Sequence, residues 1–384
     1  MRYTLLTALC AVMLALTAGC ASNKYQTKIA GVRTLLRDAD FSQAQRELAA
    51  LVEAYPDSPE SFYLYGTYHY LRGSYAQCLS YFDRAERLGY PEGLEYLTAR
   101  GIALYMVGDF VQSEETLKRS LVAGSTPAAH KYLGMIHYMN KDYSAAAEIL
   151  SLALPTYSKD EKLLSILGTS RYETGDTDGA LAAFLSAYAV NPQNEEVAFS
   201  AAQLLMLTSR YAEAADIYSA IPSDSPLAGM SMFNKAEAEI GAGRYQPAVE
   251  TLTVYLSTHP QDFTGRYNLA AALMKTRDFQ RAAEILSNLR TEKPDDIRIA
   301  FNLSLAYQHI GANEQSLVNA AFAAKRNPDN ADYLYAYAVA LERNDRRDEA
   351  AGLMSRVLAL DSSNESAREW LTAYRSTAPE KEDN

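Results

Sequence analysis

Residues 167–192 read LGTSRYETGDTDGALAAFLSAYAVNP, and this stretch decides the fold. Leu167-Gly168 lies in its first half, and Ala180, Phe184 and Ala187 lie in its second half at spacings of four and three. Apolar and small residues at such spacings share one face of a helix, and Pro192 is typical of the end of such a unit. The stretch therefore predicts two paired helices joined by a short turn.

The small residue at Ala180 recurs along the whole chain with a period of 34 residues. The intervals are 34, 35 and 33 residues, and then 34 six times. The recurring small residues are Ala44, Cys78, Ser113, Ala146, Ala180, Ala214, Ala248, Ala282, Ser316 and Ala350. A period of 20 to 50 residues is typical of stacked repeat units and not of a single globular core. Each repeat is numbered below so that this residue is position 20.

Other positions of the repeat are equally regular. Dipeptides such as Gly108-Asp109 and Lys141-Asp142 precede position 20 and predict the turn between the two helices. A glycine, alanine or serine at position 8 lets the paired helices approach closely. The pattern resembles the tetratricopeptide repeat, with Leu-Gly, an alanine, an aromatic residue and a proline at fixed phases.

This resemblance implies an all-α, right-handed superhelical solenoid of about ten helix-turn-helix repeats over residues 25–364. Residues 365–375, with Trp370, are expected to form a helix that caps the stack, and residues 376–384 are expected to be a disordered acidic tail. The signature tryptophan of the family is absent from every repeat. Arg171 and Glu239 occupy position 11, which is usually apolar, so looser packing or outward-pointing side chains are expected there.

The N-terminus predicts export. Residues 5–16 form an uncharged, mostly apolar run that is shorter than a membrane-spanning helix needs, and Leu16-Thr17-Ala18-Gly19-Cys20 follows. This sequence resembles the lipobox of bacterial lipoproteins, which implies a signal peptide over residues 1–19, lipidation of Cys20 and a short linker over residues 20–24. Ala21 and Ser22 follow the cysteine, which by the same resemblance implies an outer-membrane lipoprotein facing the periplasm if the source is Gram-negative. An ordinary signal peptide and an uncleaved anchor remain as alternatives.

Charge and motif content argue against several functions. The formal net charge is −11, and the sequence lacks the basic stripe that nucleic-acid binding requires. It contains no glycine-rich phosphate loop and no G-x-S-x-G motif. Histidines 69, 130 and 137 are interpreted as packing residues because no partners at metal-ligand spacing accompany them. The sequence therefore predicts a non-enzymatic protein, with no catalytic residue, metal site or cofactor.

Aromatic residues give the sharper prediction of a binding surface. They recur at position 12 in the first half of the chain and at position 5 in the second half, and these two positions share one helix face. In the family, that face lines a concave groove, and asparagine at position 6 binds the backbone of a peptide. The candidates are Tyr70, Tyr105, Tyr138, Tyr172, Phe199, Phe233, Tyr267, Phe301, Tyr335, Asn234, Asn268 and Asn302. The alternative is that these residues only pack and rigidify the stack.

The resulting functional hypothesis is a lipid-anchored scaffold in the bacterial cell envelope. It would bind other envelope proteins or peptides in the groove, for assembly of a pilus, a secretion system or a polysaccharide exporter. The membrane contact would be the N-terminal lipid, and nucleic acid is not an expected partner. Two alternatives stay open: a glycan- or ligand-binding envelope protein, and a non-lipidated adaptor or chaperone.

Overall fold

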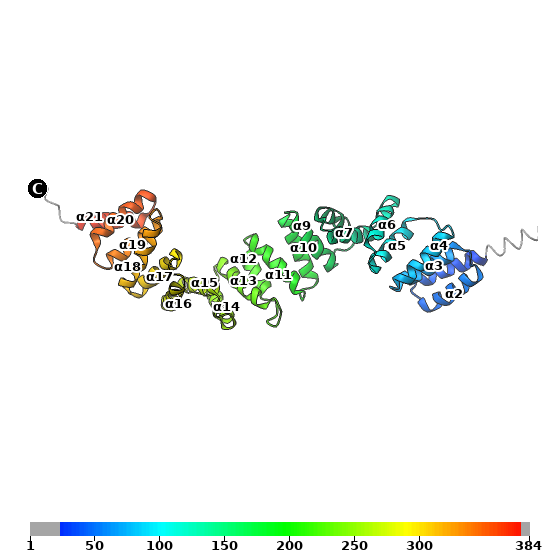
Figure 1. Cartoon of the computed structure of the whole chain (residues 1–384), viewed down its shortest axis with the longest axis horizontal. Coiled ribbons are helices and arrows are strands. Elements are labelled where there is room, and N and C mark those ends of the chain that lie inside the picture. The colour runs from blue at the N-terminus through cyan, green and yellow to red at the C-terminus, as the bar shows by residue number, and fades with distance from the viewer. Residues whose placement is uncertain (1–23, 378–384) are drawn as a thin grey trace, which may run out of the picture. The chain divides into compact units, whose positions relative to one another are not determined.

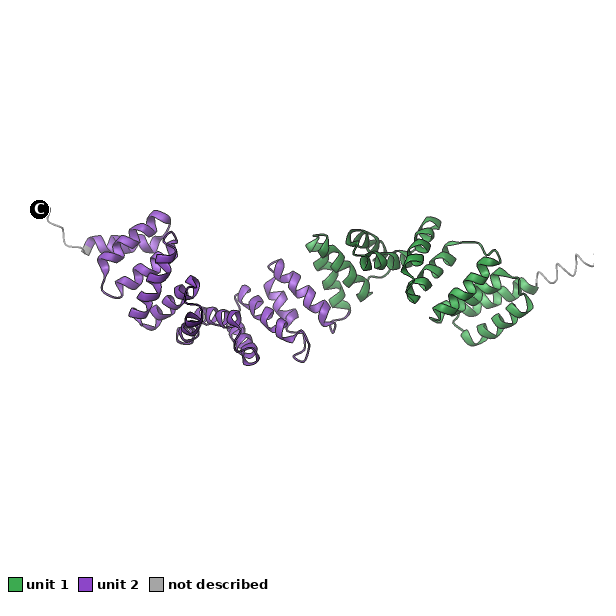
Figure 2. Cartoon of the chain, in the orientation of Figure 1, with its two compact units in different colours: residues 1–190 green, residues 191–384 purple. Residues whose placement is uncertain are grey.

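A computed structural model of the protein describes residues 24–377, which contain helices and no strands. Successive helices pack as antiparallel pairs, and the chain divides into two compact units, residues 1–190 and 191–384 (Figures 1 and 2). The predicted all-α tetratricopeptide solenoid is confirmed. The predicted signal peptide, Cys20 and residues 378–384 lie outside the described residues.

The first unit contains five helix pairs. It begins with a helix over residues 24–37. The helices that follow are α2 (Phe41–Ala54), α3 (Pro59–Leu71), α4 (Tyr75–Arg87), α5 (Leu94–Val107), α6 (Phe110–Ala123), α7 (Pro127–Met139), α8 (Tyr143–Ala153), α9 (Glu161–Glu173) and α10 (Thr177–Val190). The first helix of each pair is called helix A below and the second helix B.

The second unit contains five further pairs and a final helix. Its helices are α11 (Glu195–Leu207), α12 (Tyr211–Tyr218), α13 (Ala228–Gly241), α14 (Tyr245–Thr258), α15 (Phe263–Lys275), α16 (Phe279–Glu292), α17 (Ile297–Ile310), α18 (Asn313–Arg326), α19 (Ala331–Glu342), α20 (Arg347–Leu360) and α21 (Glu365–Thr377). The helix α21 packs on α20 through Ala367 and Leu371. It continues through Ser376 and Thr377, two residues beyond the predicted end of the capping helix.

The turn between helix A and helix B has the same backbone in every repeat. Position 15 has a positive φ in all ten repeats of the described chain, whether it is glycine, as in Gly73, or another residue, as in Ala39 and Lys141. In five repeats the next residue is an aspartate that caps helix B: the side chains of Asp109 and Asp142, for example, accept hydrogen bonds from the N–H groups of Gln112 and Ala145. The turn thus ends one helix and begins the next within three residues.

Small residues at positions 8 and 20 allow the paired helices to approach closely. Ala180 is fully buried, and a Cβ atom added to Gly168 would come within 2.7 Å of the Phe184 ring. Position 8 in this repeat therefore accepts no side chain unless the ring moves. The core of the repeats is built from such small residues and from a large apolar residue at position 24, which only the ninth repeat replaces by Ala320.

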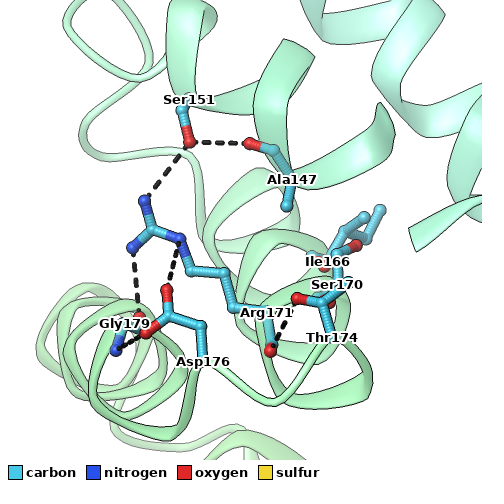
Figure 3. Close-up of polar contacts among 8 residues, drawn as sticks. All are labelled: Ala147, Ser151, Ile166, Ser170, Arg171, Thr174, Asp176 and Gly179. Atoms are coloured by element: carbon cyan, nitrogen blue, oxygen red, sulfur yellow. Dashed lines mark hydrogen bonds and ion pairs between the residues drawn. The ribbon is translucent and has the colours of Figure 1, made fainter. Parts of the chain in front are cut away.

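The polar side chains of Arg171 and Glu239 at position 11 make contacts within the array. The guanidinium of Arg171 in α9 donates hydrogen bonds to the carbonyl oxygen of Gly179 in α10 at 3.1 Å and to the hydroxyl of Ser151 in α8 at 3.2 Å (Figure 3). Its Nε lies 3.8 Å from a carboxylate oxygen of Asp176. Glu239 is 5 % exposed, with Lys235 3.7 Å from its Oε1. The expectation of outward-pointing side chains is therefore wrong at Glu239, and Arg171 joins three helices instead of weakening their contact.

Candidate protein-binding groove

The second unit contains a cavity of about 690 Å³ on the helix-A face of its first repeats. Its lining includes Phe199 and Gln203 from α11 and Met230, Phe233 and Asn234 from α13. Three of the predicted groove residues, Phe199, Phe233 and Asn234, therefore lie together. The volume falls within the range of sites that hold small molecules or the side chains of a partner. This cavity is the part of the predicted groove that the structure builds most clearly.

The two phenylalanines of this cavity are half-buried because each packs against a tyrosine. The ring of Phe199 meets Tyr218 edge-on with centroids 5.6 Å apart, and Phe233 meets Tyr255 at 5.5 Å. Such pairs hold an aromatic ring in one orientation. Each phenylalanine thus has one edge in the repeat core and one edge toward the cavity.

A polar cluster forms the edge of the cavity at the start of α15. The hydroxyl of Tyr255 donates a hydrogen bond to Asp262 Oδ2 at 2.6 Å, and the ring of His259 stacks on Tyr255 with centroids 4.5 Å apart. Burial, followed by this hydrogen bond, raises the pKa of Tyr255 to about 12. Burial also acts to raise the pKa of Asp262, but hydrogen bonds from Tyr255 and the Gly265 N–H outweigh it and hold that pKa below its usual value. The cavity therefore has an apolar wall and an anionic edge.

The three predicted asparagines each use an amide N–H within the array. Asn234 donates to the Tyr218 hydroxyl at 3.3 Å, Asn268 to Glu237 Oε1 at 3.3 Å, and Asn302 to the Tyr267 hydroxyl at 2.9 Å. A side-chain amide carries two N–H donors and one acceptor oxygen. These contacts orient the amides against neighbouring side chains, so they serve packing whether or not a peptide also binds.

Four of the five repeats in the first unit have a tyrosine at position 12, and in three of these four the tyrosine has a structural role. There the tyrosine meets the aromatic residue that begins helix B, edge-on or nearly so: Tyr70 with Tyr75, Tyr105 with Phe110, and Tyr138 with Tyr143. In the next repeat Thr177 takes the place of that aromatic residue, and Tyr172 is 51 % exposed. Tyr172 is therefore the position-12 aromatic with the most surface available to a partner.

The remaining predicted residues also contact their own array. The ring of Phe301 lies 4.7 Å from that of Tyr333, the guanidinium of Arg298 lies 5.7 Å from the Tyr267 ring, and Tyr335 packs on the core beside α20. Consecutive members of the position-5 series thus pack mainly on other side chains. Their predicted role in binding stays a prediction.

An apolar row at position 13 was not predicted from the sequence. Leu71, Met106 and Met139 lie at or next to the C-terminal ends of the A helices α3, α5 and α7. Each of these side chains is 46–48 % exposed. Leu207 continues the same position in α11 with 62 % exposed. The sequence contains a signal for this row, because these apolar residues directly follow position 12 and recur with the same period. Exposed apolar residues that repeat on one face indicate a contact surface more strongly than scattered ones do.

Residues 24–377 contain neither a cluster of metal-binding side chains nor a membrane-spanning helix. No group of three or more histidine, cysteine or acidic side chains is arranged to hold a metal ion within that range. Among the same residues, no helix is both long enough and apolar enough to cross a bilayer.

Comparison with known families decides the classification. A tetratricopeptide-repeat family model matches residues 29–91, 98–161, 167–229 and 303–365, and a second one matches residues 239–303. This chain belongs to the tetratricopeptide repeat family. Proteins of the family are generally non-catalytic scaffolds that bind other proteins, so the coarse functional prediction is supported. No curated protein matches the chain.

Solved structures similar to this chain include other repeat proteins. MamA residues 41-end from Desulfovibrio magneticus RS-1 is 21 % identical over 44 % of this chain and 97 % of its own, with a TM-score of 0.42. A tetratricopeptide repeat protein from Parabacteroides merdae ATCC 43184 is 17 % identical over 73 % of this chain and 97 % of its own, with a TM-score of 0.35. The family assignment rests on the family models and not on these structures.

Proposed function

We propose that this chain is a non-enzymatic scaffold, anchored by a lipid on Cys20 in the bacterial cell envelope, that binds proteins or peptides on its helix-A faces. The proposal for the binding surface rests chiefly on one observation. Phe199, Met230 and Phe233 gather around one cavity of about 690 Å³ that also presents Gln203 and Asn234. Apolar side chains with a few polar groups are what an extended peptide or a partner loop needs.

The proposal for the anchor rests on the sequence alone. The apolar run over residues 5–16 leads into Leu16-Thr17-Ala18-Gly19-Cys20, which resembles a lipobox. A helix begins by residue 24, so the repeats would start within a few residues of the lipid. The array would then be held close to the bilayer, where it could assemble an envelope machine such as a pilus, a secretion system or a polysaccharide exporter.

Membrane fractionation tests the anchor. The wild-type chain should fractionate with membranes and incorporate radiolabelled palmitate, and Cys20→Ala should do neither. Cys78→Ala is the matched control, because it removes a buried thiol outside the proposed lipobox. If Cys20→Ala stayed in the membrane fraction, the lipoprotein proposal would fail.

Photo-crosslinking in cells tests the groove. A benzoylphenylalanine at Met230, which lines the cavity and is 55 % exposed, should trap a partner. The same reagent at Val318 of α18, which is 69 % exposed and lies on a helix B, should trap none. Phe233→Ala should remove the adduct formed at Met230. Equal adducts at both sites would place the contact outside this cavity.

A further inference from the structure

A second cavity flanks α13 on its other side. Its volume is about 350 Å³. The lining includes Tyr218 at the end of α12 and Ile221 in the loop that follows. It also includes Ser231 and Lys235 from α13, and Glu250 and Val254 from α14. The α13 residues of this cavity lie roughly half a helix turn away from those that line the groove, since successive residues are 100° apart. The two cavities therefore use opposite faces of one helix.

The cavity lies beside the short helix α12 and the loop that follows it. The helix α12 ends at Tyr218 after 8 residues, whereas the helix B of the next repeat, α14, has 14. Residues 219–227 replace the missing turns with a loop that contains Pro222 and Pro226. Ile221, Pro222 and Ser223 of this loop line the cavity together with α13 and α14.

One buried polar group in this cavity, the hydroxyl of Ser231, makes no hydrogen bond within the described residues. Ser231 is only 3 % exposed. Several other helical serines of this chain donate to the carbonyl four residues back, as Ser200 does to Glu196 at 2.8 Å. Ser231 does not, and its residue lines the cavity. A buried hydroxyl without a partner is unfavourable for folding, so a ligand that completes it would be favoured.

The charge in this cavity comes from Lys235, one turn along α13 from Ser231. Its ammonium has one ionic contact within residues 24–377, 3.7 Å from Glu239 Oε1, which is longer than a hydrogen bond. Its N–H donors are therefore available to a ligand. Glu250 lies at the exposed edge, where Gln246 donates to it at 3.3 Å and solvent screens its charge. The inner part of the cavity thus offers a hydroxyl and an ammonium.

We propose that this cavity is a second binding site, which takes a carboxylate with a small apolar substituent, either free or as the C-terminus of a peptide. The carboxylate accepts hydrogen bonds from Ser231 and Lys235, and the apolar part lies against Ile221 and Val254. A carboxylate satisfies both donors at once, and such charge-assisted bonds are stronger than neutral ones. This site is independent of the lipid anchor and of the groove.

Methyl NMR of the purified protein tests the site with N-acetyl-leucine and N-acetyl-leucinamide as probes. The acid should shift the Ile221 and Val254 signals, and the amide should bind at least about tenfold more weakly because it lacks the charge. A heptapeptide that ends in a leucine carboxylate distinguishes the two sources. Tighter binding of the heptapeptide than of N-acetyl-leucine indicates a peptide C-terminus, and equal or weaker binding indicates a free carboxylate.

Two variants separate a binding role from a structural one. Ser231→Ala should raise Tm, because it removes an unpartnered buried hydroxyl, and should still weaken binding of the acid about tenfold or more. Lys235→Met should weaken it likewise, whereas the exposed Lys275→Met should not. The proposal is overturned if the acid leaves both methyl signals unshifted at about 10 mM, if acid and amide bind alike, or if Ser231→Ala binds like wild type.

Discussion

The guanidinium of Arg171 lies 3.2 Å from the hydroxyl of Ser151 and so joins α9 to the preceding repeat. Since the same side chain also reaches Gly179 in α10, it holds three successive helices. Hydrogen bonds to charged groups contribute about 1.5–3 kcal/mol when they are shielded. Arg171 is one-quarter exposed, so the lower part of this range applies.

Arg171→Ala should therefore lower the free energy of unfolding by about 1–2 kcal/mol. Hydrogen exchange should show the loss first in α9 and α10, because repeats unfold locally. Arg171→Leu should cost less, since leucine at this position packs well in other repeats, as Leu205 does. The control is Arg281→Ala, whose exposed pair with Asp278 should contribute below about 0.5 kcal/mol. Equal effects of the two alanine variants would refute the bridging role.

The positive φ at position 15 makes a Cβ methyl group unfavourable there, so removing it in one repeat and adding it in the next should change stability in opposite directions. Ala39 has a φ of 59°, which an alanine adopts at a cost, so Ala39→Gly should stabilise the protein by about 0.5–1 kcal/mol. Gly73 has a φ of 73° and open space where a Cβ atom would lie, so Gly73→Ala should destabilise it by about 1 kcal/mol through backbone strain alone. Urea titrations measure both. Changes of the same sign would mean that the turn is not held in this conformation.

The thiol of Cys78 should be unreactive in the folded protein. It is fully buried at position 20, and burial raises its pKa to about 12, so almost no thiolate forms at neutral pH. Ellman's reagent at pH 8 should label it only when urea opens the second repeat. The chain from residue 21 onward contains no other cysteine, so the signal has one source. Labelling without urea at the rate of a free thiol would show that this repeat opens readily.

The raised pKa of Tyr255 predicts that the folded protein loses stability at high pH. This pKa is raised to about 12 in the folded state, against about 10 in the unfolded chain. Between these values the folded state binds more protons, so the free energy of unfolding falls as pH rises. Tyr255→Phe should lose about 0.5–1.5 kcal/mol at pH 7, because the hydrogen bond to Asp262 is gone. It should then show a smaller further loss between pH 9 and 11 than wild type.

The exposed Tyr172 supplies the control for that experiment. Tyr172→Phe should retain the pH dependence of the wild-type protein. Thermal unfolding at pH 7, 9 and 11 measures the stability of the wild-type protein, Tyr255→Phe and Tyr172→Phe. If Tyr255→Phe lost as much stability between pH 9 and 11 as wild type, the Tyr255–Asp262 hydrogen bond would not contribute to this pH dependence.

The sequence predicts the repeat well because the repeat is local. Position 20 is small in every repeat, and position 24 is large in every repeat except the ninth, where it is Ala320, so a period in the sequence becomes a stack in space. The dipeptides Gly108-Asp109 and Lys141-Asp142 predict where the turn lies, but they do not predict that position 15 has a positive φ even where it is lysine or alanine, as at Lys141 and Ala39. The length of α12 was not predicted, although Pro222 and Pro226 fall where a full helix B would continue.

The candidate site was harder to predict because it depends on rotamers. The period correctly indicates that Phe199 of α11 and Phe233 and Asn234 of α13 lie on the same side of successive A helices. These three residues do line one cavity. The period does not indicate that Asn302 turns toward Tyr267, since that depends on a contact between neighbouring repeats. Nor does it identify Met230 or His259, which occur once at their positions and follow no period.

The stacked pair of Trp370 and Tyr374 in α21 has a practical consequence for measuring cooperativity. Trp370 is the only tryptophan of the chain, so its fluorescence reports on the last helix alone. Cys78 reports on the second repeat. Repeat arrays behave as one-dimensional chains of coupled units, whose coupling length decides whether distant units melt together. A single urea titration followed through both residues would therefore measure how far one repeat's folding is felt along the array.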